Sequence, residues 1–220
     1  MIGRKRRPLD PRKGFPWFVL SFFLLSLVLA EAGCGRMPRI IVLSDPLSAE
    51  EHMELGLAYE RNGEFDLAIR EYERALRKER GFFQARVNLG NVWLEKKEYE
   101  KARDEYRNAL AIRPGDPEAT NNLAWTAILS GEQREEAEER MEAVLSRPEN
   151  RSAILYDTIG VLRTRLGKSA AAEEAFTEAE RLCLEAEGDG CSREILREIR
   201  DHRSEGERRF PSPAPSPLVQ

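Results

Sequence analysis

Residues 53–76 read MELGLAYERNGEFDLAIREYERAL, and their pattern of small and aromatic residues returns 34 positions further along the chain. The pair Leu55-Gly56 is followed by Leu89-Gly90, by Leu123-Ala124 after another 34 residues, and by Ile159-Gly160 after 36 more. A period in this range is typical of a solenoid in which each unit is a pair of helices. The sequence therefore predicts about four structural repeats.

The second half of each unit carries a small residue and, four positions later, a large one. The small residues are Ala68, Ala102, Ala137 and Ala172, and the large ones are Tyr72, Tyr106, Met141 and Phe176. A step of four places both residues on one face of a helix. Helices of this kind bury their apolar faces by stacking on neighbouring units, so the pattern predicts an all-α fold. The third pair comes one residue late, which indicates one extra residue in the loop before it.

These residues resemble the tetratricopeptide repeat family over residues 48–182, and residues 87–114, VNLGNVWLEKKEYEKARDEYRNALAIRP, match its pattern as well as residues 53–76 do. The resemblance implies a right-handed helix-turn-helix solenoid of about four units with a C-terminal capping helix. The predicted units are residues 48–82, 83–116, 117–150 and 151–187, and the predicted capping helix is residues 191–205. Arg163 stands where the family has an aromatic residue, so we expect a more exposed last unit.

The recurring small and aromatic residues have a mechanical explanation. We expect Gly56, Gly90 and Gly160 to let the two helices of one unit approach closely, and the aromatic residues to fill the gaps between units. They are therefore interpreted as core residues and not as a cofactor site.

Helix boundaries are also marked in the sequence. Ser48 followed by Glu51 predicts a capping box at the start of the first helix, and Asp116-Pro117 predicts an N-cap with a first-turn proline. Either Asn150 or Ser152 opens the fourth unit. The turns inside units contain Gly63, Gly131 and Gly167, where glycine accepts a positive φ.

Residues 1–33 have the composition of an export signal. Six basic and two acidic side chains lie in this segment, and an apolar stretch runs from Phe15 to Ala30. This stretch is too short to span a bilayer, which requires about 20 residues. Ala32-Gly33-Cys34 resembles the end of a bacterial lipoprotein signal, which implies acylation of Cys34. Glu31 departs from that pattern, and Ala30-Glu31-Ala32 also fits ordinary cleavage before Gly33; an uncleaved anchor is the third possibility.

The location expected from this signal is the bacterial cell envelope, with the protein anchored to a membrane and facing the periplasm. A soluble periplasmic protein is the alternative. Residues 34–47 are expected to form a spacer, and residues 206–220 a disordered, proline-rich tail. Cys183 and Cys191 flank the end of the last unit, and in an oxidising compartment we expect them to form a disulfide.

Charge and motif content exclude several classes of function. The net charge of the whole chain is −4, and because residues 1–33 are basic, the remainder carries −8. An acidic surface argues against binding nucleic acid, which requires clustered Lys and Arg. The two histidines, His52 and His202, are far apart, and His52 is interpreted as a packing residue. No phosphate loop, nucleophile motif or metal-spaced cluster is found, so we predict no enzyme, no metal, no cofactor and no small-molecule substrate.

The resemblance implies that positions 2, 5, 6, 9, 12 and 13 of each unit line a concave groove. The candidate partner-binding residues selected from these positions are Gln84, Asn88, Asn91, Asn121, Asn122, Trp125, Asp157 and Thr158. Asparagine both donates and accepts hydrogen bonds, so a row of Asn can pair with the backbone of an extended peptide. Alternatively, these amides hydrogen-bond only between helices. Family members that clamp acidic C-terminal peptides use groove cations, which are missing from the first three units.

The sequence thus predicts a non-catalytic scaffold that binds a protein or extended peptide partner in the groove. Envelope lipoproteins of the family include assembly factors for pilus secretins, which makes such an assembly role the concrete version of the hypothesis. The alternative is an accessory or substrate-recruiting subunit of an envelope polysaccharide or peptidoglycan enzyme system.

Overall fold

The computed structural model describes residues 45–186 and 191–209. The chain divides into two compact units, Met1–Asp45 and Pro46–Gln220, and all the described residues except Asp45 belong to the second. Within them the chain forms α-helices and one short 3-10 helix, without a strand, which confirms the predicted all-α solenoid. The helices are α2 (Ala49–Arg61), α3 (Phe65–Lys78), α4 (Phe83–Glu95), α5 (Tyr99–Ile112), α6 (Pro117–Ser130), α7 (Arg134–Leu145), η1 (Pro148–Asn150), α8 (Ala153–Arg165), α9 (Ser169–Glu185) and α10 (Arg193–Arg209).

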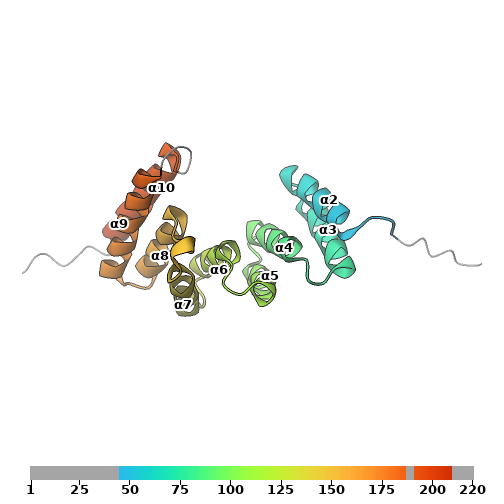
Figure 1. The fold of residues 1–220 in the computed structure, drawn as a ribbon, viewed down its shortest axis with the longest axis horizontal. Helices are drawn as coiled ribbons and strands as arrows, with labels where there is room; N and C mark the ends of the chain where they lie inside the picture. The colour runs from blue at the N-terminus through green and yellow to red at the C-terminus, as the bar shows by residue number, and fades with distance from the viewer. Residues whose placement is uncertain (1–44, 187–190, 210–220) are drawn as a thin grey trace, which may run out of the picture. The chain divides into compact units, whose positions relative to one another are not determined.

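The helices form four consecutive pairs, α2 with α3, α4 with α5, α6 with α7, and α8 with α9, and α10 packs on the last pair (Figure 1). Each second helix also packs on the first helix of the next pair. The stacking buries the apolar stripe of one unit against the next, which a single unit is unable to do.

A glycine of the first helix lies directly under a ring of the second helix in three of the four units. An ideal Cβ on Gly56 would lie 2.5 Å from Tyr72 Cε1, and one on Gly160 would lie 2.6 Å from Phe176 Cε1. The large rings therefore fill space inside their own unit as well as the predicted gaps between units, where Tyr72 packs in one cluster with Leu89 and Val92 of α4. In the third unit Ala124 and Met141 are buried in one apolar cluster, where a flexible side chain accommodates the extra methyl group.

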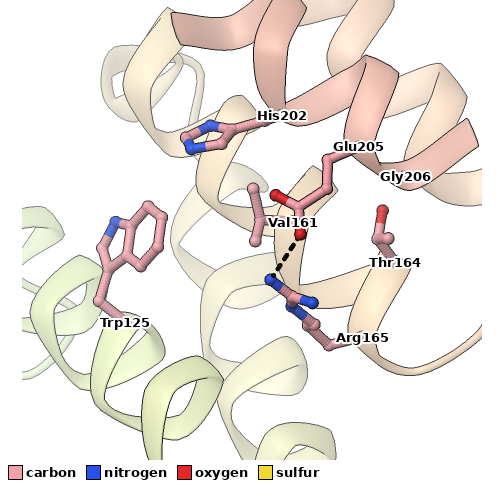
Figure 2. A pocket seen from close by; sticks show the side chains of 7 residues that line it. All are labelled: Trp125, Val161, Thr164, Arg165, His202, Glu205 and Gly206. Carbon is pink, nitrogen blue, oxygen red and sulfur yellow. Dashed lines mark hydrogen bonds and ion pairs between the residues drawn. The ribbon is translucent and has the colours of Figure 1, made fainter. Parts of the chain in front are cut away.

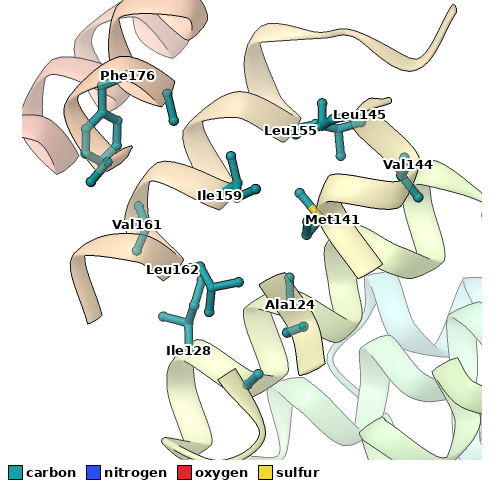
Figure 3. Packing of buried hydrophobic residues seen from close by; sticks show 14 residues of the cluster. Ala124, Ile128, Met141, Val144, Leu145, Leu155, Ile159, Val161, Leu162 and Phe176 are labelled. Carbon is teal, nitrogen blue, oxygen red and sulfur yellow. The ribbon is translucent and has the colours of Figure 1, made fainter. Parts of the chain in front are cut away.

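The largest apolar cluster joins α6, α7, α8 and α9 (Figure 3). Met141, Ile159, Leu162 and Phe176 are almost fully buried in it. The sequence predicted a more exposed fourth unit because of Arg163, but this residue does not leave the unit exposed. Its guanidinium pairs with Glu138 at 3.2 Å and with Glu142 at 2.7 Å, so it ties α8 to α7.

The predicted caps are present. Ser48 and Glu51 form a reciprocal capping box at α2, and Asp116 Oδ1 accepts a hydrogen bond from the backbone N–H of Ala119 at 3.0 Å. Ser152 caps α8 by accepting from Leu155, whereas Asn150 lies in η1. The choice left open by the sequence is therefore settled in favour of Ser152.

The turns between the helices of a unit place one residue in the left-handed region. Gly63 and Gly167 have φ of 74° and Gly131 has φ of 82°, as predicted. In the second unit the same position is Lys97, with φ of 61°. The additional residue of the third unit is accommodated just before α7, where Gln133 also has a positive φ of 56°.

The C-terminal helix α10 ends at Arg209, four residues beyond the predicted capping helix, because Glu207, Arg208 and Arg209 are good helix formers that prolong it. Its Ile199 is buried with Ala179 and Cys183 of α9. Cys183 and Cys191 are bonded, with their Cα atoms 5.0 Å apart.

The predicted export signal, the lipidation site Cys34, most of the spacer and residues 210–220 lie outside the described residues. Among the residues that the structure does describe, none of the helices has both the length and the apolar character needed to cross a bilayer.

Candidate partner-binding groove

The predicted groove residues lie on the first helices of units two to four. Gln84, Asn88 and Asn91 are on α4, Asn121, Asn122 and Trp125 are on α6, and Asp157 and Thr158 are on α8. In the structure some of these residues are joined by hydrogen bonds, some are partly exposed and others are buried.

Asn91 and Asn122 connect α4 to α6. Asn91 Oδ1 accepts a hydrogen bond from Asn122 Nδ2 at 3.0 Å and another from the Tyr106 hydroxyl at 2.7 Å. Burial, followed by the nearby carboxylates of Glu118 and Glu60, raises the pKa of Tyr106, so its hydroxyl stays protonated and remains a donor. Both amides keep part of their surface exposed while their orientation is fixed.

Asn88 is largely withdrawn from the surface. It is 6% exposed, and its Oδ1 accepts from Gln84 Nε2 at 3.1 Å. Asn88 therefore supports the orientation of Gln84, which is partly exposed one turn earlier on α4. The interhelical alternative considered from the sequence thus applies to Asn91 and Asn122, and Asn88 has a structural role both within α4, through Gln84, and toward Tyr72 of α3.

Asp157 and Thr158 lie where α10 packs on α8; they are largely buried and line a hollow there together with Trp125. Asp157 Oδ2 accepts from His202 Nδ1 at 2.8 Å, and the Thr158 hydroxyl donates to the Ile154 carbonyl at 3.0 Å. They are buried because α10 packs on α8 as the first helix of a further unit would. The hydrogen bond to Asp157 raises the pKa of His202.

Trp125 stands between two hollows. The ring of His202 lies 5.8 Å from it, and beyond that contact is a pocket of about 70 Å³ (Figure 2). Figure 2 shows that α6 contributes Trp125, α8 contributes Val161, Thr164 and Arg165, and α10 contributes His202, Glu205 and Gly206. Arg165 and Glu205 form an ion pair across it at 3.4 Å.

The second hollow has a volume of about 150 Å³. Its lining residues are Trp125, Ile154, Asp157, Thr158, Ile195, Glu198 and Ile199.

Sequence reasoning treated His202 as an isolated histidine and missed its position beside Trp125. The spacing of Ile195, Ile199 and His202 along one helix face, together with a solenoid end that needs covering, was the signal available for finding it.

Two exposed apolar side chains flank Trp125. Leu129, one turn further along α6, is 52% exposed, and Ile154 at the start of α8 is 53% exposed. Both occupy groove positions of the repeat. With Trp125 they form an apolar stripe beside the amides of α4 and α6, and we call these residues together the groove.

The groove offers docking chemistry. Within residues 45–186 and 191–209, no three His, Cys, Asp or Glu side chains are grouped so that they could hold a metal ion. The groove's side chains are instead amides, an indole and aliphatic groups, which suit contacts with a peptide backbone and apolar side chains.

Comparison with protein families supports the repeat fold. Residues 53–117 match the model of the tetratricopeptide repeat. A curated relative, the heat-shock protein cognate co-chaperone sgt12 of Aspergillus fumigatus, is 32% identical over 103 residues, which are 47% of this chain. The chain spans only 28% of the length of that relative.

Solved structures show the same fold at low identity. A MamA protein superposes with a TM-score of 0.55 at 19% identity, over 73% of this chain and 92% of that one. PilW, a widely conserved type IV pilus biogenesis factor, gives 0.56 at 18%, over 73% and 78% of the two chains. The pilF protein of Pseudomonas aeruginosa gives 0.55 at 23%, over 72% and 76%.

Proposed function

We propose that the chain is a tetratricopeptide-repeat protein and acts as a non-catalytic scaffold that binds an extended segment of a partner protein along the groove. Repeats of this kind present rigid, continuous surfaces, and binding to a preformed surface avoids much of the entropic cost of ordering the receptor.

The observation that carries this proposal is the apolar stripe. Only four large apolar side chains are exposed in the described part of the chain, and two of them, Leu129 and Ile154, flank Trp125. Exposed apolar groups that gather next to an aromatic residue are characteristic of interaction surfaces, whereas scattered ones are not.

The amides beside the stripe supply the polar part of recognition. Asn91 and Asn122 are held by their mutual hydrogen bond and keep partly exposed surfaces. Asn121 Oδ1 is buried and finds no hydrogen-bond partner among the described residues. An extended segment that lies along α4 and α6 would satisfy such groups through its backbone, with its apolar side chains on Trp125 and Leu129.

The proposed location is the bacterial cell envelope. It rests on the export signal in residues 1–33 and on structural relatives such as PilW, a type IV pilus biogenesis factor. We place the protein on a membrane through acylated Cys34, facing the periplasm, with an envelope complex such as a pilus secretin as its partner. Several acyl chains on one cysteine anchor a protein stably, whereas one chain does not.

Site-specific photocrosslinking tests the groove. A photoreactive phenylalanine analogue is placed at Leu129 in the groove, and in a matched chain at Glu139, which is exposed on α7. We expect a partner crosslinked from position 129 and not from position 139. A pore protein supports the assembly role, and a synthase or hydrolase supports the accessory-subunit alternative. Equal crosslinking from both positions, or crosslinking from 139 alone, contradicts the groove.

Mass spectrometry of the mature N-terminus tests the anchor. We expect an acylated peptide that begins at Cys34. An unmodified peptide that begins at Gly33 contradicts membrane anchoring through this residue and indicates a soluble periplasmic protein.

A further inference from the structure

The larger hollow beside Trp125 combines apolar walls with two carboxyl groups. Trp125, Ile154, Ile195 and Ile199 contribute aromatic and aliphatic surface, and Asp157 and Glu198 contribute the acids, from α8 and α10 respectively. None of the residues that line it is basic. We call this hollow the acidic pocket.

Asp157 is the unusual residue of the acidic pocket. Its side chain is 9% exposed, and its Oδ2 is taken by His202. Its other oxygen, Oδ1, is buried and has no hydrogen-bond partner among the described residues. A buried carboxylate oxygen without a donor is costly, so this position favours a ligand that brings one.

The charges around the pocket favour a cation. Glu198 is exposed on α10 and adds a second negative charge at the rim. The nearest groups of opposite sign are already paired, since His202 bonds Asp157 and Arg165 bonds Glu205 in the neighbouring pocket. Glu205 also lies close to His202. The surroundings therefore leave a net negative field directed at the hollow.

The size of the pocket limits the occupant to one side chain. Its volume of about 150 Å³ is well above the roughly 10–15 Å³ of such space that one water molecule needs. The aliphatic walls suit a methylene stem, and the face of Trp125 attracts a positive charge.

We infer that the acidic pocket binds a lysine or arginine side chain of the partner segment, with the stem against Ile154, Ile195 and Trp125 and the charged head between Asp157 and Glu198. This inference rests on the proposed function, because the segment that lies in the groove delivers the basic residue. The partner is therefore expected to carry a cationic residue adjacent to apolar residues that contact the stripe.

Fluorescence anisotropy tests the inference on the full chain in mild detergent. The probes are fluorescein-labelled capped heptapeptides, Ala-Ser-Leu-X-Leu-Ser-Ala, in which X is lysine, arginine, norleucine or glutamate. We expect the lysine and arginine peptides to bind about tenfold more tightly than the norleucine peptide, and the glutamate peptide most weakly. Equal affinities for lysine and norleucine, or no binding of the lysine peptide at millimolar concentration, overturn the inference.

Matched variants locate the effect. Glu198→Gln removes a pocket charge at an exposed position and should weaken lysine-peptide binding about three- to tenfold, whereas Glu194→Gln, one turn earlier on α10 and outside the pocket lining, should not. Asp157→Asn keeps the shape of the side chain and should abolish the preference for lysine over norleucine. An equal loss in Glu198→Gln and Glu194→Gln overturns the assignment to the pocket.

The outcome is separable from that of the proposed function. If a partner crosslinks from position 129 but the lysine and norleucine peptides bind equally, the proposed groove is supported. Only the inferred cation site is then contradicted. Absence of groove crosslinking contradicts the proposed function, whatever the peptides do.

Discussion

Gly90 of α4 lies against the ring of Tyr106 of α5 so closely that an ideal Cβ at Gly90 would come within 2.6 Å of Tyr106 Cε1. The ring is fully buried, and its hydroxyl is held by Asn91, the residue after the glycine. One contact therefore sets the distance between two helices and also fixes an amide of the groove. The packing of the solenoid and the geometry of its candidate site depend on the same pair.

Gly90→Ala is expected to destabilise the protein. The ring of Tyr106 has no room to move, so overpacking costs about 1–3 kcal/mol, partly offset by about 1 kcal/mol from the better helix propensity of alanine. Urea denaturation should show a net loss of up to about 2 kcal/mol. The control is Gly81→Ala, because a Cβ there meets nothing within 4 Å. If both variants change stability equally, the contact with Tyr106 does not limit the packing.

Lys97→Gly is expected to stabilise the protein. Lys97 adopts φ of 61° at the position where the other units have Gly63, Gly131 and Gly167. Relief of about 1–2 kcal/mol of left-handed strain exceeds the entropic disadvantage of glycine, about 0.5–1 kcal/mol. We expect a net gain of up to about 1 kcal/mol in urea denaturation. Gly63→Ala, where no neighbour lies within 4 Å, should lose a similar amount; a gain there would contradict the backbone explanation.

The sequence predicted the repeat and its caps well because both are local. The period of 34 residues, Ser48 with Glu51, and Asp116 with Pro117 depend on residues close in the chain. Arg163 was misjudged because its partners, Glu138 and Glu142, belong to the preceding unit and carry no repeat signal.

The candidate site was predictable only in part. The repeat register placed Asn91, Asn122 and Trp125 on facing first helices, but it gave no information on which amides bond to one another. Asp157 and Thr158 were assigned to an accessible face because the register does not say where α10 packs. That contact depends on side chains 45 residues apart, His202 and Asp157.

Removing the disulfide is expected to lower stability. Cys183 and Cys191 close a short loop, and the chain-entropy model gives about 2–3 kcal/mol for a loop of this size. Thermal melts with and without a reductant should differ for the natural chain. The double variant Cys183→Ala with Cys191→Ala should melt at one temperature in both conditions. Complete alkylation of both cysteines in denatured, unreduced protein would contradict the bond.

The ion pair of His202 and Asp157 predicts a pH dependence. The pKa of His202 is raised by its hydrogen bond to Asp157, so protonated His202 favours the folded state. This contribution is fully present below the unfolded value of about 6.5 and is lost as pH rises through the higher folded pKa. The difference in unfolding free energy between the natural chain and His202→Gln should therefore be larger at pH 6 than at pH 9. A difference that stays constant, or that grows with pH, would show that the pair does not titrate in this way.

The groove amides should separate into structural and accessible ones. Asn88→Ala removes the acceptor of Gln84 at a buried site and should cost about 1–2 kcal/mol of stability. Asn122→Ala leaves Asn91 its bond from Tyr106, so its stability should change by less than about 1 kcal/mol while partner binding weakens. Thermal melts and binding of the crosslinked partner measure the two effects. Normal partner binding by Asn122→Ala would place the contact surface elsewhere.

The bond between Cys183 and Cys191 also makes the two ends of the repeat array unequal. Arrays whose units contact only their neighbours open by fraying from their ends. At one end, α10 is fastened covalently next to α9, and at the other, α2 is held by its capping box and its packing on α3. Fraying is therefore expected to begin at α2 and α3, so their amide protons exchange with solvent before those of α9. The helices that surround Trp125 belong to the end that opens last.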